Sequence, residues 1–256
     1  MISEKFPTYH EFALAELGDI YGEDLDAAKK FTATRLDSVV LVNDGKGSFE
    51  INPLPRLAQI SPGFGTAITD FDGDGMNDLL IGQNFMHPQP ETGQMDGGLG
   101  LLLKGDGAGT FESVGPIESG VSIPGQAMAV SVTDINADGR PDVLVSVNDD
   151  PVVLLRNQAR SDLQSVRIRL VGGKGNTAAI GARVAVQQMP SSTTMTVFDV
   201  NAGHGYLSQS DGSIFLSTSL DKLKINVTWP DGTSQSEVVS TEAGIIVIEK
   251  SGQSEP

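Results

Sequence analysis

Cysteine is absent from the 256 residues of this chain, which excludes disulfide bonds, zinc–thiolate sites and thiol chemistry. Basic residues are scarce as well: 17 Lys and Arg stand against 33 Asp and Glu, and the net charge of −16 disfavours binding to nucleic acid and to anionic membranes. No apolar run is long enough to span a membrane, and residues 1–5 lack the apolar stretch of an export signal. Without disulfides, stability in an exposed compartment must come from another source.

Glycine and short apolar segments are what the chain does contain. The 30 glycines accompany an apolar content of 39%, a combination that suits many short strands joined by tight turns better than long helices. A chain of this length forms one large domain or two ordinary ones, with a real hydrophobic core. The composition therefore favours an all-β protein.

Internal repetition organises the middle of the chain. Residues 36–84 and 99–148 follow one pattern: an apolar strand, a Gly-rich hairpin turn, an irregular stretch, a strand of small residues, an Asp-rich loop and another apolar strand. Two pairs of equivalent residues keep nearly one spacing, 62 and 64 positions: Phe49 with Phe111, and Asp70 with Asp134. This indicates a duplication, and four strands per period are typical of a propeller blade, so we predict about two blades over residues 33–160. The predicted strands include residues 38–42, 66–68, 79–81, 99–103, 127–130, 143–145 and 152–155.

The flanking segments differ from the repeats. Apolar residues at helical spacing predict a helical segment over residues 1–32, with helices at 9–20 and around 25–31 that are separated by a break at 21–24. We interpret this segment as packing on the β-structure; a loosely ordered leader is the alternative.

Residues 165–250 alternate apolar and polar side chains with a period of two, as in half-buried antiparallel strands. Seven short strands in this segment predict a small β-sandwich-like domain, with Trp229 in its core. The predicted strands are residues 166–170, 183–187, 194–200, 213–216, 223–229, 236–239 and 245–249.

Two Asp-rich loops carry the chemistry, at residues 70–78 and 134–142. Each places oxygen-bearing side chains at loop positions 1, 3, 5 and 9, with Gly at position 6 for a sharp turn and a backbone carbonyl available at position 7. The predicted ligands are Asp70, Asp72, Asp74, Met76 and Asp78 in the first loop, and Asp134, Asn136, Asp138, Arg140 and Asp142 in the second; Met76 and Arg140 would contribute their carbonyls.

Calcium is the cation that these loops suit. Carboxylates crowded within a few ångströms repel one another by several kcal/mol, so an unmetallated acidic turn is the less favoured alternative. The loops are not EF-hands, because position 12 holds Ile81 or Val145 instead of Glu. Magnesium keeps its waters, and zinc prefers Cys and His. We expect a structural ion, which would fill at extracellular calcium concentrations and indicates a location outside the cytoplasm.

The first loop and its surroundings resemble the FG-GAP, or VCBS, repeat of integrin-type β-propellers. The matching residues are Phe64-Gly65, the loop at 70–75 and the strand at 78–82. The second copy departs from the pattern at Gln126-Ala127, at Ala137 and at Ser146, but keeps its ligand positions.

The C-terminal part resembles the ASPIC/UnbV domain that follows such repeats in cartilage acidic protein and its bacterial relatives. Four ordered segments carry the resemblance, at residues 166–172, 181–184, 203–210 and 227–233. The two resemblances span about residues 36–250. They imply partial propeller blades with a short helical N-terminal piece, followed by a small β domain, in a secreted or surface protein of adhesive character. Since a closed propeller needs at least four blades, we expect this chain to be the C-terminal fragment of a longer precursor whose preceding blades are missing.

Ligand contacts are predicted at the Gly-flanked loop around His204 and Tyr206, which suits a protein or glycan ligand. His204, Ser208 and Asp211 lie too close in sequence, and without a nucleophile elbow, for a hydrolytic triad. No catalytic residue is predicted, and we expect a non-enzymatic, extracellular, calcium-binding adhesion or ligand-binding module. Two alternatives stay open: an accessory or catalytic part of a secreted polysaccharide-acting enzyme, and a passive scaffold.

Overall fold

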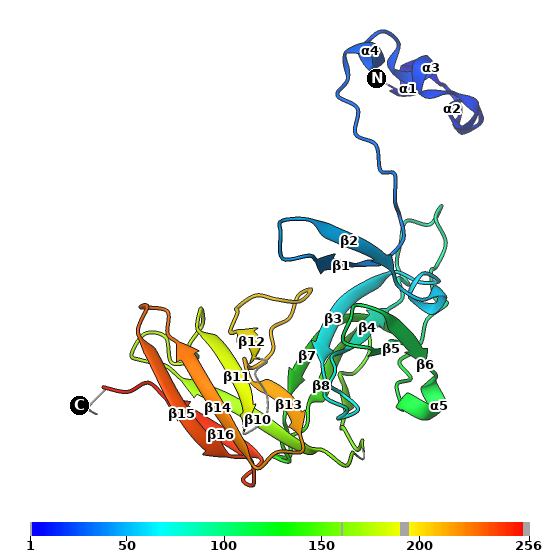
Figure 1. The fold of residues 1–256 in the computed structure, drawn as a ribbon. Helices are drawn as coiled ribbons and strands as arrows, with labels where there is room; N and C mark the ends of the chain where they lie inside the picture. The colour runs from blue at the N-terminus through cyan, green and yellow to red at the C-terminus, as the bar shows by residue number, and fades with distance from the viewer. Residues whose placement is uncertain (1, 160, 190–194, 253–256) are drawn as a thin grey trace. The chain divides into compact units, whose positions relative to one another are not determined.

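The computed structural model describes residues 2–159, 161–189 and 195–252 (Figure 1). The chain divides into two compact units, residues 1–36 and residues 37–256. Among the described helices, none is long and apolar enough to cross a membrane.

The first unit contains four short helices: α1 (Ile2–Lys5), α2 (Tyr9–Leu14), α3 (Leu17–Tyr21) and α4 (Asp24–Ala27). The prediction of one continuous helix over residues 9–20 is wrong, because Ala15 adopts an extended backbone and ends α2. The Glu16 N–H then donates to the Asp19 carboxylate at 3.0 Å, which starts a new helix. The packing of this segment on the β-structure stays a prediction.

Antiparallel sheets form the repeat region of the second unit. Its β-hairpin, four-stranded sheet and three-stranded sheet pair their strands in chain order. The strands are β1 (Val39–Asn43) with β2 (Phe49–Pro53); β3 (Gly63–Thr69), β4 (Asp78–Gln83), β5 (Leu101–Gly105) and β6 (Phe111–Val114); and β7 (Gln126–Thr133), β8 (Asp142–Asn148) and β9 (Val153–Leu155). A 3-10 turn (Arg56–Ala58) follows β2, and the short helix α5 (Pro116–Ser119) follows β6.

The sheets are out of phase with the sequence repeat. The four-stranded sheet joins the hairpin β3–β4, from the end of one period, to the hairpin β5–β6, from the start of the next. Pairing of Leu79 with Leu103 and of Ile81 with Leu101 crosses that boundary. These sheets are propeller-like blades, and they do not close into a ring within the described part of the chain.

Close backbone contact holds the two larger blades together. A Cβ on Gly65 of β3 would lie 2.7 Å from the Val130 nitrogen and 2.8 Å from the Met128 oxygen, both on β7. A side chain at position 65 would therefore force β3 and β7 apart, which explains why glycine follows Phe64 here. A buried cluster that includes Leu80 and Val145 spans the same two blades.

The C-terminal domain consists of two facing sheets with one core between them. The sheets have strand orders β13-β10-β16 and β12-β11-β14-β15, and only β10 and β16 pair in parallel among the described strands. Trp229 is 3% exposed and donates its ring N–H to Gln235 at 3.3 Å, so the predicted core position is confirmed. The strands are β10 (Gln164–Val171), β11 (Arg183–Met189), β12 (Met195–Asp199), β13 (Ile214–Thr218), β14 (Lys222–Thr228), β15 (Ser234–Ser240) and β16 (Ile245–Glu249).

All seven predicted strands are present in this domain, although position 194 of the third lies outside the described residues. Alternating side chains reach the shared core, as at Val166 and Ile168 of β10 and at Leu223 and Ile225 of β14, which are all fully buried. The all-β fold class, with blade-like sheets and a few short helices, is confirmed.

Candidate metal centre

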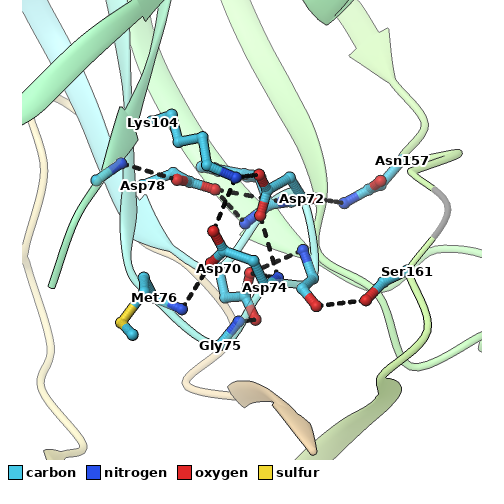
Figure 2. Close-up of polar contacts among 12 residues, drawn as sticks. Asp70, Asp72, Asp74, Gly75, Met76, Asp78, Lys104, Asn157 and Ser161 are labelled. Carbon is cyan, nitrogen blue, oxygen red and sulfur yellow. Dashed lines mark hydrogen bonds and ion pairs between the residues drawn. The ribbon is translucent and has the colours of Figure 1, made fainter.

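The first Asp-rich loop forms the turn between β3 and β4, and its own backbone wraps around Asp70. The Asp70 carboxylate accepts hydrogen bonds from the N–H groups of Gly73 at 2.8 Å, Asp74 at 3.1 Å and Gly75 at 3.0 Å (Figure 2). Gly73 and Gly75 have φ values of 79° and 90°, a left-handed conformation that glycine adopts without strain. The glycine spacing therefore builds a loop that closes on its first carboxylate.

Asp78 closes the other end of the loop. One of its oxygens accepts from the N–H groups of Phe71 at 2.9 Å and Asp72 at 3.2 Å, and the other accepts from Gly105 of β5 at 3.1 Å. The carboxylate thus ties the turn to the next hairpin of the same sheet.

Three of the five predicted first-loop ligands converge. One carboxylate oxygen from each of Asp70, Asp72 and Asp78 lies within 4.8 Å of the other two, the only such group among the described residues. Burial raises the pKa of Asp70 and of Asp78, because a charged carboxylate is costly away from water. An oxygen-only set of anionic donors, of which Asp70 and Asp78 are buried, fits a hard cation such as calcium.

Lys104 of β5 reaches the same cluster and was missed in the sequence. Its ammonium group contacts the Asp72 carboxylate and lies 2.7 Å from the Asp74 carboxylate (Figure 2). Hydrogen bonds to Asp72 and then to Asp74 raise the pKa of Lys104. Burial works to raise the pKa of Asp74, but the Lys104 contact and the Met76 N–H outweigh it and lower that pKa.

These contacts correct one expectation. A bound ion is not the only group that can offset the repulsion between the crowded carboxylates, because backbone N–H groups and Lys104 also offset their negative charge. Asp74 turns toward Lys104 and does not join the converging group. Met76 donates its N–H to Asp74 at 2.8 Å, and its predicted role as a carbonyl ligand stays a prediction.

The second loop, between β7 and β8, repeats the backbone arrangement. Asp134 accepts from the N–H groups of Asp138 and Gly139, both at 3.0 Å. Asp142 accepts from Ile135 at 3.0 Å and from Asn157 at 2.7 Å. The end residues of the two loops are therefore equivalent in structure as well as in sequence.

The interior of the second loop is different. The Arg140 guanidinium binds Asp138 at 2.7 Å, and Asn136 donates its amide to the same carboxylate at 2.9 Å. Burial works to raise the pKa of Asp138, but the Arg140 side chain, the Asn136 amide and the Arg140 N–H together outweigh it and lower that pKa. Arg140, predicted only as a carbonyl donor, thus supplies a positive charge within its own loop. The carboxylates of this loop form no converging group of three in the described structure.

Both loops lie against the C-terminal domain. Arg167 of β10 places its guanidinium 3.6 Å from Asp134, 2.7 Å from Asp211 and 2.8 Å from the Ser213 hydroxyl. At the first loop, the Ser217 hydroxyl bonds to the Asp70 carboxylate. Phe215, from the same strand, is 7% exposed and packs in the hydrophobic cluster of the blades.

The loop proposed for ligand contacts also meets the blades. The Tyr206 ring packs on Phe64 with 5.4 Å between centroids and stays 43% exposed, while His204 is exposed. Asp211 bonds to Thr133 at 2.9 Å and to Arg167, and no hydrogen bond joins it to His204 in the described residues. Tyr206 and Asp211 thus both contribute to the contact between the C-terminal domain and the blades.

Two family models match the chain. The model described as FG-GAP-like repeat matches residues 93–145, which include the second Asp-rich loop, and the model described as ASPIC and UnbV matches residues 172–254. A search of curated proteins finds no match.

Proposed function

Because this chain is an FG-GAP repeat protein with a C-terminal ASPIC/UnbV domain, we propose that it is a non-catalytic, extracellular ligand-binding module whose blades are stabilised by calcium. The observation that carries the proposal is the convergence of Asp70, Asp72 and Asp78 within 4.8 Å in the turn between β3 and β4. Carboxylates that are buried, and whose pKa burial raises, gain most from a divalent partner.

Calcium would be held at the first loop by these three carboxylates, and its charge would offset theirs. Asp78 also bonds to Gly105, and Asp70 bonds to Ser217 of the C-terminal domain. An ion that orders the loop would therefore also stabilise its contacts with the next hairpin and with the C-terminal domain. We propose the second loop as a weaker site, because Arg140 already neutralises Asp138 there.

Sites of this kind in extracellular modules have Kd values of about 10⁻⁴–10⁻³ M, which supports a location where calcium is plentiful. The proposed ligand is a protein or a glycan, with His204 and the exposed part of Tyr206 as the first contacts to test. The proposed preceding blades would complete the propeller and extend the binding surface.

Calorimetry with and without calcium tests the proposal. With a Kd of about 0.1 mM and about 1 mM free calcium, stabilisation is about 1.4 kcal/mol, or about 3 to 6 °C in Tm relative to EDTA. The Asp70→Asn variant should lose this shift. The matched control, Asp96→Asn, removes one exposed carboxylate elsewhere and should keep it. Identical transitions in calcium and in EDTA for the unmodified protein would rule out the stabilising ion.

A glycan array and a pulldown with the whole chain test the ligand. Binding that His204→Ala weakens, without a change in Tm, supports the proposed contact loop. Hydrolysis of an arrayed polysaccharide would instead favour the enzymatic alternative.

A further inference from the structure

The last blade ends one strand short of its neighbour. Strand β5 pairs with β4 on one side and with β6 on the other, whereas β9 pairs only with β8 in the described chain. The registers show that the two strands are equivalent, because Leu103 pairs with Leu79 and Leu155 pairs with Val143, at the same place in each sheet. The outer edge of β9 is therefore the position that β6 occupies in the preceding blade.

A cavity of about 510 Å³ lies between the blades beside this edge. Its walls are mixed. Leu80 and Leu102 of the four-stranded sheet and Val143 and Leu155 of the last one form the apolar part, and Asp72, Asp78 and Lys104 of the candidate metal centre line it as well. Ile117 of α5 also lines it and is fully exposed. A free sheet edge beside a partly apolar cavity is the arrangement that binds an added strand.

The outer strands β2 and β6 indicate which residues an added strand would carry. Phe49-Glu50 in β2 and Phe111-Glu112 in β6 take the same register, with the acid opposite Val42 or Lys104. The residue equivalent to Lys104 is Arg156, directly after β9, which is exposed and has no ion pair in the part of the chain that the structure describes.

We propose that the β9 edge and this cavity bind one extended peptide strand, antiparallel to β9, that carries an aromatic residue followed by an acid. The acid would lie opposite Arg156. The aromatic residue would lie opposite Asn157, on the same face of the sheet as Leu155, and would enter the cavity. In the preceding blade, Phe111 holds the equivalent position and packs on the core of its own sheet.

Fluorescence anisotropy with the whole chain and a labelled peptide of residues 109–115, which contains β6, tests the proposal. Saturable binding is expected, weakened about fivefold by Arg156→Glu, since an exposed ion pair contributes up to about this factor. Replacing the peptide's Phe with Ala should weaken binding about tenfold or more, because the ring is the main apolar contact. The matched control, Arg169→Glu, reverses another exposed arginine and should bind like the unmodified protein.

A charge swap separates this site from general attraction. A peptide with Glu112→Lys should bind the unmodified protein more weakly and Arg156→Glu more strongly than the original peptide does. General electrostatics predict the opposite for the unmodified protein, because its net charge of −16 favours the more basic peptide.

Ile117→Ser should weaken binding, whereas Leu207→Ser, at another exposed apolar residue, should not. Equal affinity of both peptides for Arg156→Glu would overturn the proposal. So would a dimer of the chain, seen by sedimentation, that the peptide fails to dissociate, because a second copy would then be the occupant of the edge.

Discussion

The guanidinium of Arg167 lies 3.6 Å from the carboxylate of Asp134, which joins the C-terminal domain to the second Asp-rich loop. The Asp134 side chain is fully buried and that of Arg167 is 15% exposed. If one of the two charges were removed, water could not replace it as the partner of the other. At the first loop the positive charge comes from Lys104 of β5, which contacts Asp72 and Asp74. The duplicated loops thus receive their positive charges from different segments of the chain.

Replacing Arg167 with Gln should leave Asp134 buried without its partner. We expect a loss of about 3 kcal/mol in the free energy of unfolding and faster proteolysis of the linker at residues 157–163. Urea denaturation and limited proteolysis measure the two effects. Arg169→Gln is the control, because Arg169 is an exposed neighbour on the same strand. Equal stability of the two variants would show that the Arg167 contact is not important for the interface.

Replacing Lys104 with Gln should change metal-free stability and calcium affinity in opposite directions. Without calcium, loss of the contacts to Asp72 and Asp74 should lower stability by up to about 1 kcal/mol, since the lysine is half exposed. Calcium affinity should rise about fivefold, because a competing positive charge is gone. Titration calorimetry and thermal melts in EDTA measure these effects. A lowered affinity would show that Lys104 helps to hold the ion site in place.

Replacing Gly65 with Ala should separate the two larger blades. The added methyl group would come within 2.8 Å of two backbone atoms of β7, which cannot move as a side chain does. We expect a loss of about 1 to 3 kcal/mol, measured by chemical denaturation. Gly115→Ala is the control, since nothing lies within 4 Å of its Cβ position, and it should cost about 0.5 kcal/mol or less. A neutral Gly65→Ala would mean that β3 and β7 tolerate a wider spacing.

The ion pair between Asp231 and Lys250 should make the stability of the C-terminal domain depend on pH. The Lys250 ammonium group lowers the pKa of Asp231 well below its usual value of 3.8. A lowered pKa means that the stabilisation is present above about pH 4 and declines as pH falls further. Asp231→Asn should therefore lower Tm at pH 7 and lose this difference progressively below pH 4.

Thermal melts between pH 3 and pH 7 measure this dependence, with Asp221→Asn as an exposed control in the same domain. A difference in Tm that persists unchanged at pH 3 would contradict it.

The sequence predicted best what depends on near neighbours. Alternation along β10 and β14 places every second side chain in one core, so seven strands could be located from pattern alone. The Asp loops are equally local, because Asp70 and Asp78 bond to backbone groups of their own turn. The break at Ala15 was missed because the apolar spacing continues through it, although the capping bond from Glu16 to Asp19 gives a local reason for it.

Contacts between distant segments were not predictable in the same way. Lys104 lies 32 positions from Asp72, and no pattern within the loop specifies it. The phase of the sheets was also hidden, since a periodic sequence has no unique starting point. The strand pairing, Leu79 with Leu103 and Ile81 with Leu101, is what shows that β5 belongs with β4.

This offset between sequence and sheet has a consequence for how such arrays grow. The first hairpin of each period completes the sheet that the preceding period began. Its last hairpin in turn begins a sheet that the following period completes. A chain that gains or loses one full period consequently keeps the same two kinds of end, whatever its length. Repeat number can therefore change without a new capping structure, while each sheet that crosses a repeat boundary combines strands from two successive periods.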